Sequence, residues 1–147
     1  LAHPEQRDAL LKDWGLLEGA VHELFRFVSI AQLSKPRFAR SDTEFFGQAL
    51  PRGATIFACL ASANVDPSRF PDPERFDIRR PPQRNLSLGS GIHFCLGAAL
   101  ARAETEIALR QLLSRHPDLR LAIPRDEVRY SARPGVRGLE SLHVTWG

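Results

Sequence analysis

Apolar residues recur at helical spacing in three stretches of the chain, and each stretch predicts a helix. Residues 5–13 form the first, because Pro4 suits the first position of a helix. Residues 17–28 form the second, in which apolar side chains extend almost all round the helix and predict that it is buried. Residues 98–116 form the third, which Pro117 stops. Its expected buried stripe comprises Leu100, Ala103, Ile107 and Leu112 or Leu113.

Shorter apolar runs between and after these helices predict small β-sheets. Short strands are expected over residues 37–39, 43–46, 54–60, 119–123, 128–131 and 142–146. The segment 64–82 differs, because repeated prolines prevent long regular structure there. Its Phe70 and Phe76 predict an ordered, packed meander rather than a linker. The whole pattern predicts one domain over residues 1–147, mainly α with small β-sheets.

Length and charge narrow the class of protein. The chain has 147 residues, 43% of them apolar, which is enough for one domain with a core and excludes disorder. The net charge is only +3, and acidic residues lie between the arginines, which disfavours nucleic-acid binding. The longest uncharged run that could pass for apolar, residues 54–65, is too short to cross a bilayer. We therefore expect a soluble cytoplasmic protein with no membrane partner. The start at Leu1 instead of Met predicts that the natural beginning is missing.

The segment 88–97, Leu-Gly-Ser-Gly-Ile-His-Phe-Cys-Leu-Gly, carries the most informative chemistry. Its first two glycines let the backbone curl and approach something flat. Cys95 lies just ahead of the third predicted helix, where free N–H groups and the helix dipole favour a thiolate. Gly97 removes a side chain beside whatever Cys95 binds. A thiolate in these apolar surroundings suits a soft metal ion.

Other interpretations of Cys95 stay open on the residues alone. A single cysteine is more often part of a core than of a site. Zinc needs about four ligands, and His93 with Cys95 supplies two at poor spacing. His93 is also too close in sequence to be the obvious base for a cysteine nucleophile. No Gly-Lys-Ser/Thr follows the glycines, as a phosphate-binding loop requires. Cys59 lies in an apolar run and is interpreted as structural.

A charged pair stands out on the second predicted helix. Glu23 and Arg26 are three residues apart, so their side chains share one face. An exposed pair of this kind adds little stability. Because apolar residues flank both positions, we expect the pair to be partly buried and to have further partners.

Three motifs together resemble the cytochrome P-450 superfamily. Residues 88–97 resemble its haem-binding loop, Phe-Gly-x-Gly-x-His/Arg-x-Cys-x-Gly. Residues 23–26, Glu-Leu-Phe-Arg, match its Glu-x-x-Arg helix, and residues 72–76, Asp-Pro-Glu-Arg-Phe, match its meander motif. The motifs occur in the family's order and approximate spacing, which argues strongly against a chance match. The soluble bacterial branch fits best, also through residues 36–39 and 136–139.

The resemblance assigns cofactor-binding roles to matching residues. Cys95 would be the axial thiolate ligand of the iron in haem b, and His93 and Arg37 would bind the haem propionates. The other implied cofactor contacts are Leu88, Gly89, Gly97 and Ala101. Leu88 stands where the family usually has phenylalanine, and both residues can shield the sulfur.

The same resemblance implies three further groups of residues. The buried charge network behind the haem would comprise Glu23, Arg26 and Arg75. The substrate pocket would include Gln32, Leu33 and Val136. Arg102, one turn into the helix after Cys95, would lie on the face where an electron donor docks.

The implied function is that of a haem-thiolate monooxygenase of the bacterial cytoplasm. Such an enzyme inserts one oxygen atom of O2 into an apolar small molecule, with electrons from a ferredoxin-type donor and its reductase. The alternative is a non-catalytic haem-binding or sensing module that has lost oxygen activation. The resemblance covers this chain but only the C-terminal, haem-proximal third of a family member. We therefore expect a missing distal half, or another copy of the chain, as a partner, and no competent enzyme from these residues alone.

Overall fold

The computed structural model describes residues 1–147 and contains four α-helices. They are α1 (Pro4–Lys12), α2 (Leu17–Val28), α3 (Leu60–Ala63) and α4 (Ala98–Arg115). The three helices expected from the apolar pattern, which correspond to α1, α2 and α4, are confirmed to within one residue at each end. Helix α1 begins at a proline, and α2 ends where Ser29 adopts the left-handed conformation, with φ of 45°. Short 3₁₀ turns lie at Trp14–Leu16, Gly91–His93 and Arg125–Glu127.

Six short strands pair into three separate antiparallel sheets of two strands each. The pairs are β1 (Arg37–Phe38) with β4 (Thr55–Ile56), β2 (Thr43–Phe45) with β3 (Gln48–Leu50), and β5 (Arg120–Leu121) with β6 (Val144–Thr145). The expected fold class, mainly α with small sheets, is therefore confirmed.

Three details of the strand prediction differ from the structure. The strand expected over 54–60 ends at Ile56, and the chain then turns into α3. The run 128–131 forms only a single bridge, between Tyr130 and Leu139. The apolar pattern does not predict strand β3. This strand pairs with β2 across a two-residue turn. That turn consists of Phe46 and Gly47, with φ of 49° and 76°, as a tight hairpin requires.

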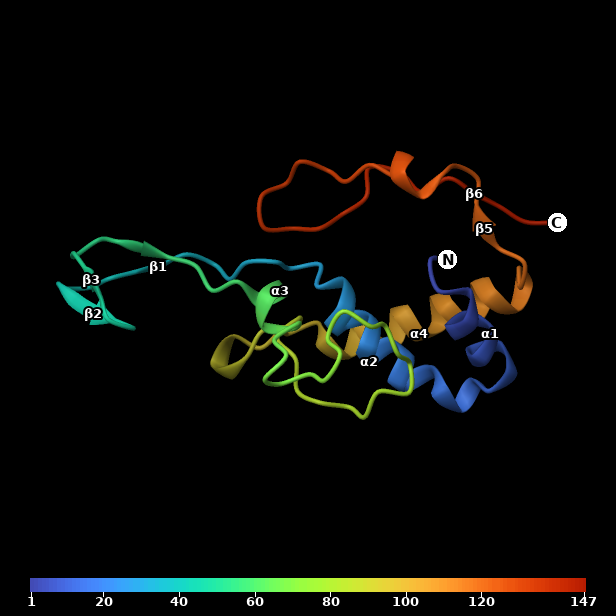
Figure 1. The fold of residues 1–147 in the computed structure, drawn as a ribbon, viewed down its shortest axis with the longest axis horizontal. Coiled ribbons are helices and arrows are strands. Elements are labelled where there is room, and N and C mark those ends of the chain that lie inside the picture. Colours follow the sequence, from blue (N-terminus) through green and yellow to red (C-terminus); the bar gives the residue numbers. More distant parts are fainter.

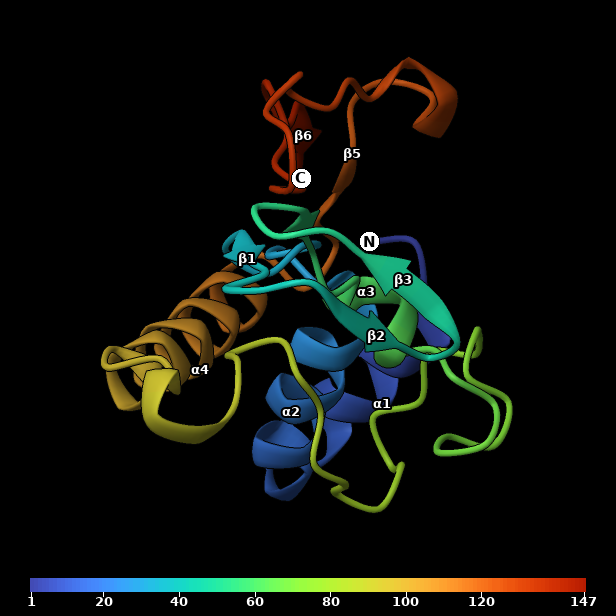
Figure 2. The ribbon, with the colours of Figure 1, turned by 90° about the vertical axis from the view of Figure 1, so that its left-hand side faces the viewer.

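The chain has three visible parts (Figure 1). Helices α1, α2 and α4 form a body, and β1 to β4 form an arm that projects from it. The segment from β5 to the C-terminus runs along one side of the body, as both views show (Figures 1 and 2). Helices α2 and α4 lie side by side, and the loop that connects the meander to α4 passes beside both.

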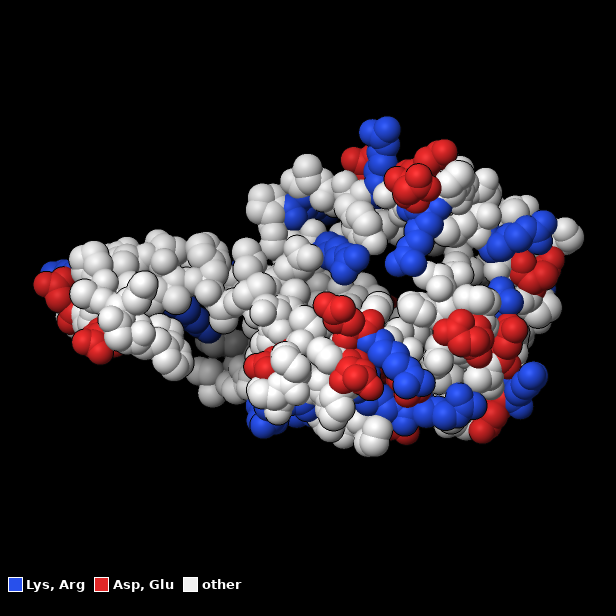
Figure 3. All heavy atoms as spheres, in the orientation of Figure 1, with Lys and Arg blue, Asp and Glu red and all other residues white.

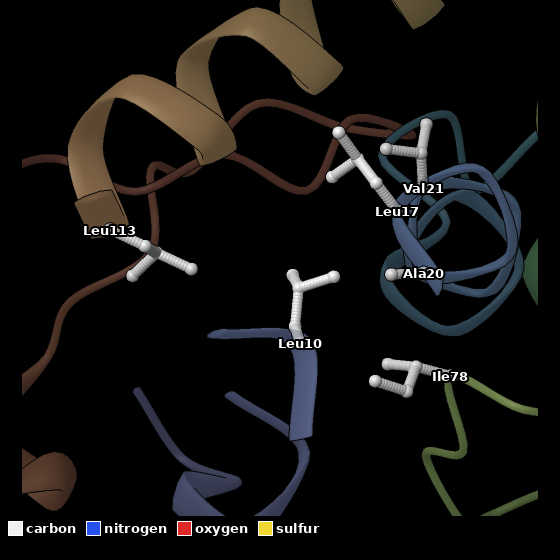
Figure 4. Close-up of a cluster of buried hydrophobic side chains, with 6 residues drawn as sticks. All are labelled: Leu10, Leu17, Ala20, Val21, Ile78 and Leu113. Atoms are coloured by element: carbon white, nitrogen blue, oxygen red, sulfur yellow. The ribbon is translucent and has the colours of Figure 1, made fainter. Parts of the chain in front are cut away.

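A small apolar core joins the helices of the body to the meander (Figure 4). Its buried members are Leu10, Leu17, Ala20, Val21, Ile78 and Leu113. Burying one large apolar side chain stabilises a fold by roughly 1.5–3 kcal/mol. A hydrogen bond of 3.0 Å from the Ile78 N–H to the Gln6 side-chain oxygen adds a polar tie between the meander and α1. The core therefore fixes α2, α4 and the meander, the three segments that surround the loop 88–97.

Of the stripe predicted on α4, only Leu113 is confirmed as buried, and Ala103 is exposed. Leu100 and Ile107 are 63% and 62% exposed, whereas Ala98 and Leu113 are buried. Helical spacing shows correctly that Leu100 and Ile107 share a face, but it does not show what lies opposite that face. Helices α1 and α2 pack against the other side of α4, where Leu109 and Leu113 meet the core.

Charged side chains are mixed over the surface. On the face in Figure 3, basic and acidic side chains alternate over the helical body, and most of the arm is uncharged except near its tip. The longest helix, α4, carries charged side chains along its length, and no helix has the length and apolar character to cross a membrane.

Candidate functional site

The loop 88–97 curls back on itself and brings Cys95 opposite Leu88. The Cys95 N–H donates to the Leu88 carbonyl at 2.9 Å, and the Phe94 N–H donates to the Gly91 carbonyl at 3.0 Å. Gly89 and Gly91 adopt φ of 76° and 70°, a conformation that other residues rarely adopt, so the two glycines make the curl possible. Helix α4 begins directly after the loop and extends away from Cys95.

Cys95 presents a free, partly buried thiol among apolar side chains. Ile92 and Leu96 are almost fully exposed, and Phe94 is half exposed. A methyl group added at Gly97 would lie 4.0 Å from the Cys95 sulfur, so a larger side chain there would crowd the sulfur. The loop therefore offers one sulfur ligand within an apolar surface. No cluster of three or more His, Cys, Asp or Glu side chains in the chain could hold a metal ion by itself.

The other predicted cofactor residues lie in this loop, except Arg37 in the arm and Ala101 in α4. His93 is exposed at the end of the 3₁₀ turn, two residues before Cys95. Arg37 is exposed on β1, in the arm, and no hydrogen bond joins it to the loop. Gly89 and Ala101 are partly buried, at the curl and in the first turn of α4. Leu88 lines a cavity of about 90 Å³ together with Phe25 and Phe94.

Glu23 and Arg26 form a buried pair on α2. Both side chains are at most 2% exposed, and two hydrogen bonds of 2.7 Å join the guanidinium to both carboxylate oxygens. Arg26 also donates to the carbonyls of Asn64 at 2.8 Å and Pro73 at 2.9 Å. A buried charge needs such partners. Removing one member of a buried ion pair costs about 3–5 kcal/mol, because the other charge is left unpaired. The pair therefore fastens the meander to α2.

Arg80, rather than Arg75, completes this network with its side chain. The Arg80 Nε lies 3.1 Å from the Glu23 Oε1, and its guanidinium also donates to the carbonyls of Pro71, Asp72 and Arg75. The prediction for the Arg75 side chain is wrong: it is 67% exposed and only approaches Asp77, at 3.9 Å. The reason is the path of the meander, which turns the main-chain carbonyl of Arg75 inward and its side chain outward.

The sequence motif does not show which arginine of the meander contacts Glu23. Arg75, Arg79 and Arg80 all follow the Asp-Pro pair at 72–73 within a few residues. The one indication in the sequence is Glu23 itself. Its carboxylate can accept hydrogen bonds from more than one guanidinium, so a second arginine can bind it.

The residues expected to line a substrate pocket lie together. Gln32 and Val136 line an open groove of about 400 Å³. The Gln32 N–H donates to the Gly135 carbonyl at 2.8 Å, and Leu33 packs against Gly135. Two segments more than a hundred residues apart in sequence thus form one surface.

Arg102 lies on α4 close to a histidine that the motifs did not indicate. His22, Arg84 and Arg102 line the same 90 Å³ cavity as Leu88. Burial lowers the pKa of His22 below its ordinary value, and the charge of Arg102 lowers this pKa further. The nearby carboxylates of Glu18 and Glu23 act in the opposite direction without reversing the shift. His22 therefore stays neutral at lower pH than a free histidine.

This arrangement predicts a pH dependence of stability. Because the pKa of His22 is lower in the folded chain than in the unfolded chain, protonation favours unfolding. The stabilising contribution is fully present above the ordinary pKa of about 6.5 and is lost as the pH falls through the folded pKa. In an NMR titration, Arg102→Gln should raise the pKa of His22, whereas Arg52→Gln in the arm should leave it unchanged. An unchanged pKa of His22 in Arg102→Gln would contradict the effect assigned to the charge of Arg102.

Comparisons with known proteins agree on one family. A family model described as Cytochrome P450 matches residues 4–123. The chain is similar to cytochrome P450 monooxygenase PikC of Streptomyces venezuelae, with 44% identity over 99% of this chain and 35% of the relative. It is also similar to the solved structure of the polyketide synthase cytochrome P450 PksS of Bacillus subtilis. The two share 41% identity with a TM-score of 0.95, over 99% of this chain and 38% of that one. The myxobacterial cytochrome P450 CYP267B1, solved with myristic acid, gives 44% identity and a TM-score of 0.96, over 100% of this chain and 36% of that one.

The matched family model, the curated relative and the two solved structures are all cytochromes P450. The chain belongs to the cytochrome P450 family. It spans about a third of the length of the curated relatives that it matches.

The residues around Cys95 fit the haem that this family implies. A porphyrin supplies four nitrogen ligands itself, so one protein sulfur is sufficient, and the absence of a multi-ligand cluster in this chain is compatible with that donor set. The exposed apolar side chains of Ile92 and Leu96 are suited to a flat, largely apolar ligand.

Proposed function

We propose that the complete protein containing this chain is a haem-thiolate monooxygenase that oxidises an apolar small molecule. The observation that carries the proposal is the free thiol of Cys95, which lies beside exposed apolar residues just before α4, with its main-chain N–H bound to the Leu88 carbonyl. The bound haem would supply the activation of O2, with one oxygen atom inserted into the substrate and the other released as water.

The chain's own residues would bind and orient haem b. Cys95 would hold the iron as a thiolate, and Gly97 would keep space beside the sulfur. His93 and Arg37, both exposed, would donate hydrogen bonds to the two propionates from the loop and from the arm. Leu88 would shield the sulfur from the inner side, where the family usually has a phenylalanine.

Two surfaces would serve the partners of the reaction. The groove lined by Gln32 and Val136, together with Leu33 beside Gly135, would contact the apolar substrate. Arg102, exposed on α4, would belong to the face where a ferredoxin-type donor delivers electrons in the bacterial cytoplasm. Consumption of NADPH in the presence of a ferredoxin, its reductase and an apolar substrate tests this function. The proposal requires consumption that depends on the substrate and yields an oxidised product. Haem-loaded protein that yields no product with any apolar substrate would contradict it.

We further propose that segments outside these 147 residues supply the second wall of the haem site. The exposed apolar side chains at Ile92, Leu96 and Leu100 give one open surface, and a haem needs most of its own surface buried. The 147-residue chain alone should therefore associate with itself or with a complementary chain. Size-exclusion chromatography with intact-mass analysis measures this. A uniform monomer of 16.4 kDa that binds haem stoichiometrically and oxidises substrate would show the proposal to be wrong.

A further inference from the structure

Asn64 is a completely buried amide at the junction of three segments. Its side chain is 0% exposed, although the residue lies at the end of the short helix α3. Its Nδ2 group donates to the Ser29 hydroxyl at 2.9 Å and to the Ser87 hydroxyl at 2.8 Å. Its Oδ1 accepts from the Leu86 N–H at 2.7 Å. Both N–H groups and the carbonyl oxygen of the amide are therefore used.

The two serines that accept from Asn64 are themselves bound to α2. The Ser29 hydroxyl donates to the Arg26 carbonyl at 2.8 Å, and the Ser87 hydroxyl donates to the Phe25 carbonyl. The main-chain carbonyl of Asn64 also accepts from the Arg26 guanidinium. Asn64 thus ties the C-terminal end of α2 to residues 86–87, which lead directly into the loop of Cys95.

The connection from Asn64 to Cys95 is short and made of hydrogen bonds. Leu86 and Ser87 are fixed by the amide, and Leu88 is the next residue along the chain. The Leu88 carbonyl accepts from the Cys95 N–H at 2.9 Å. A shift of residues 86–87 would therefore move the carbonyl that holds the main chain of Cys95.

We propose that Asn64 is a positioning residue for Cys95, which keeps the sulfur in the place required for ligation of the iron. This inference rests on the proposed haem-thiolate function. Asparagine is the residue that suits the site, because aspartate has an oxygen in place of the donating Nδ2, and glutamine would add a methylene to a completely buried site. Alanine would leave the Leu86 N–H buried without its partner.

The two serines provide a matched pair of variants. Ser87→Ala and Ser29→Ala each remove one acceptor of the Asn64 amide and one donor to a carbonyl of α2. They differ in that only Ser87 belongs to the segment that leads to Cys95. The readout is the rate at which the reduced, CO-bound protein loses the red-shifted Soret band of thiolate ligation, measured on the complete haem-loaded protein.

We expect Ser87→Ala and Asn64→Asp to lose this band about tenfold faster than the parent, the factor that corresponds to one buried hydrogen bond. Ser29→Ala should lose stability to heat but keep the parental rate. Equal rates in Ser87→Ala and Ser29→Ala would overturn the inference while leaving the proposed function intact. A parent protein without the band would overturn both. If Asn64→Asp fails to fold, the comparison of Ser87→Ala with Ser29→Ala still tests whether Asn64 positions Cys95.

Discussion

Replacing Arg26 by leucine is expected to give misfolded, haem-free protein. The substitution leaves the Glu23 carboxylate buried at 2% exposure with Arg80 as its one remaining cationic partner. It also removes the donors that hold the carbonyls of Asn64 and Pro73. Breaking a buried pair from one side costs about 3–5 kcal/mol. Since a domain has a total stability of about 5–15 kcal/mol, that cost is a large fraction of the whole.

The arginines of the meander give this prediction its control. Arg80→Leu removes the donor to three main-chain carbonyls, so we expect a loss of about 1–3 kcal/mol or more in the free energy of unfolding. Arg75→Leu changes an exposed side chain and should stay within about 0.5 kcal/mol of the parent. Denaturant unfolding together with the yield of haem-loaded protein measures all three variants. Equal costs for Arg75→Leu and Arg80→Leu would contradict the network, and a folded, haem-loaded but inactive Arg26→Leu would indicate a chemical role instead.

Local signals in the sequence were sufficient for the helices. The apolar spacing within 17–28 and the proline after α4 act over one or two turns, so they predict α2 in full and α4 to within one residue. The motif around Cys95 was equally local, because the two glycines, the cysteine and the start of α4 lie within eleven residues.

Features that depend on distant segments could not be predicted in this way. Arg80 differs from Arg75 in where the meander turns its side chain, and only Arg80 reaches Glu23, more than fifty residues away. Asn64 gives no signal in sequence, since the partners of its side chain are Ser29, which follows α2, and residues 86–87. The buried face of α4 likewise depends on α1 and α2.

The exposure of Cys59 also could not be predicted from the sequence. The apolar run predicts a strand over 54–60 with a structural role for Cys59, but α3 begins at Leu60 and Cys59 is exposed. Apolar composition alone does not distinguish a core strand from a short strand at a surface.

The second large effect is expected at Cys95. Cys95→Ser should abolish the thiolate-type spectrum, because the chain offers no other group of ligands near the loop and a hydroxyl is a far weaker ligand for iron than a thiolate. Main-chain contacts should persist, since the bond from the residue 95 N–H to the Leu88 carbonyl does not involve the sulfur. Haem absorption spectra of the purified variant measure the change.

Cys59→Ser is the matched control. Its thiol is exposed, so the substitution should leave both the haem spectrum and the stability close to those of the parent. Loss of the thiolate-type spectrum in Cys59→Ser with retention in Cys95→Ser would reverse the assignment.

The central claim, that Cys95 binds haem iron as a thiolate, is tested most directly by the absorption spectrum of the complete protein after reduction and exposure to CO. With Cys95 as the thiolate ligand, the parent shows a red-shifted Soret band that is absent from Cys95→Ser. Reduced protein that contains haem but lacks this band, or a band that persists in Cys95→Ser, would contradict it.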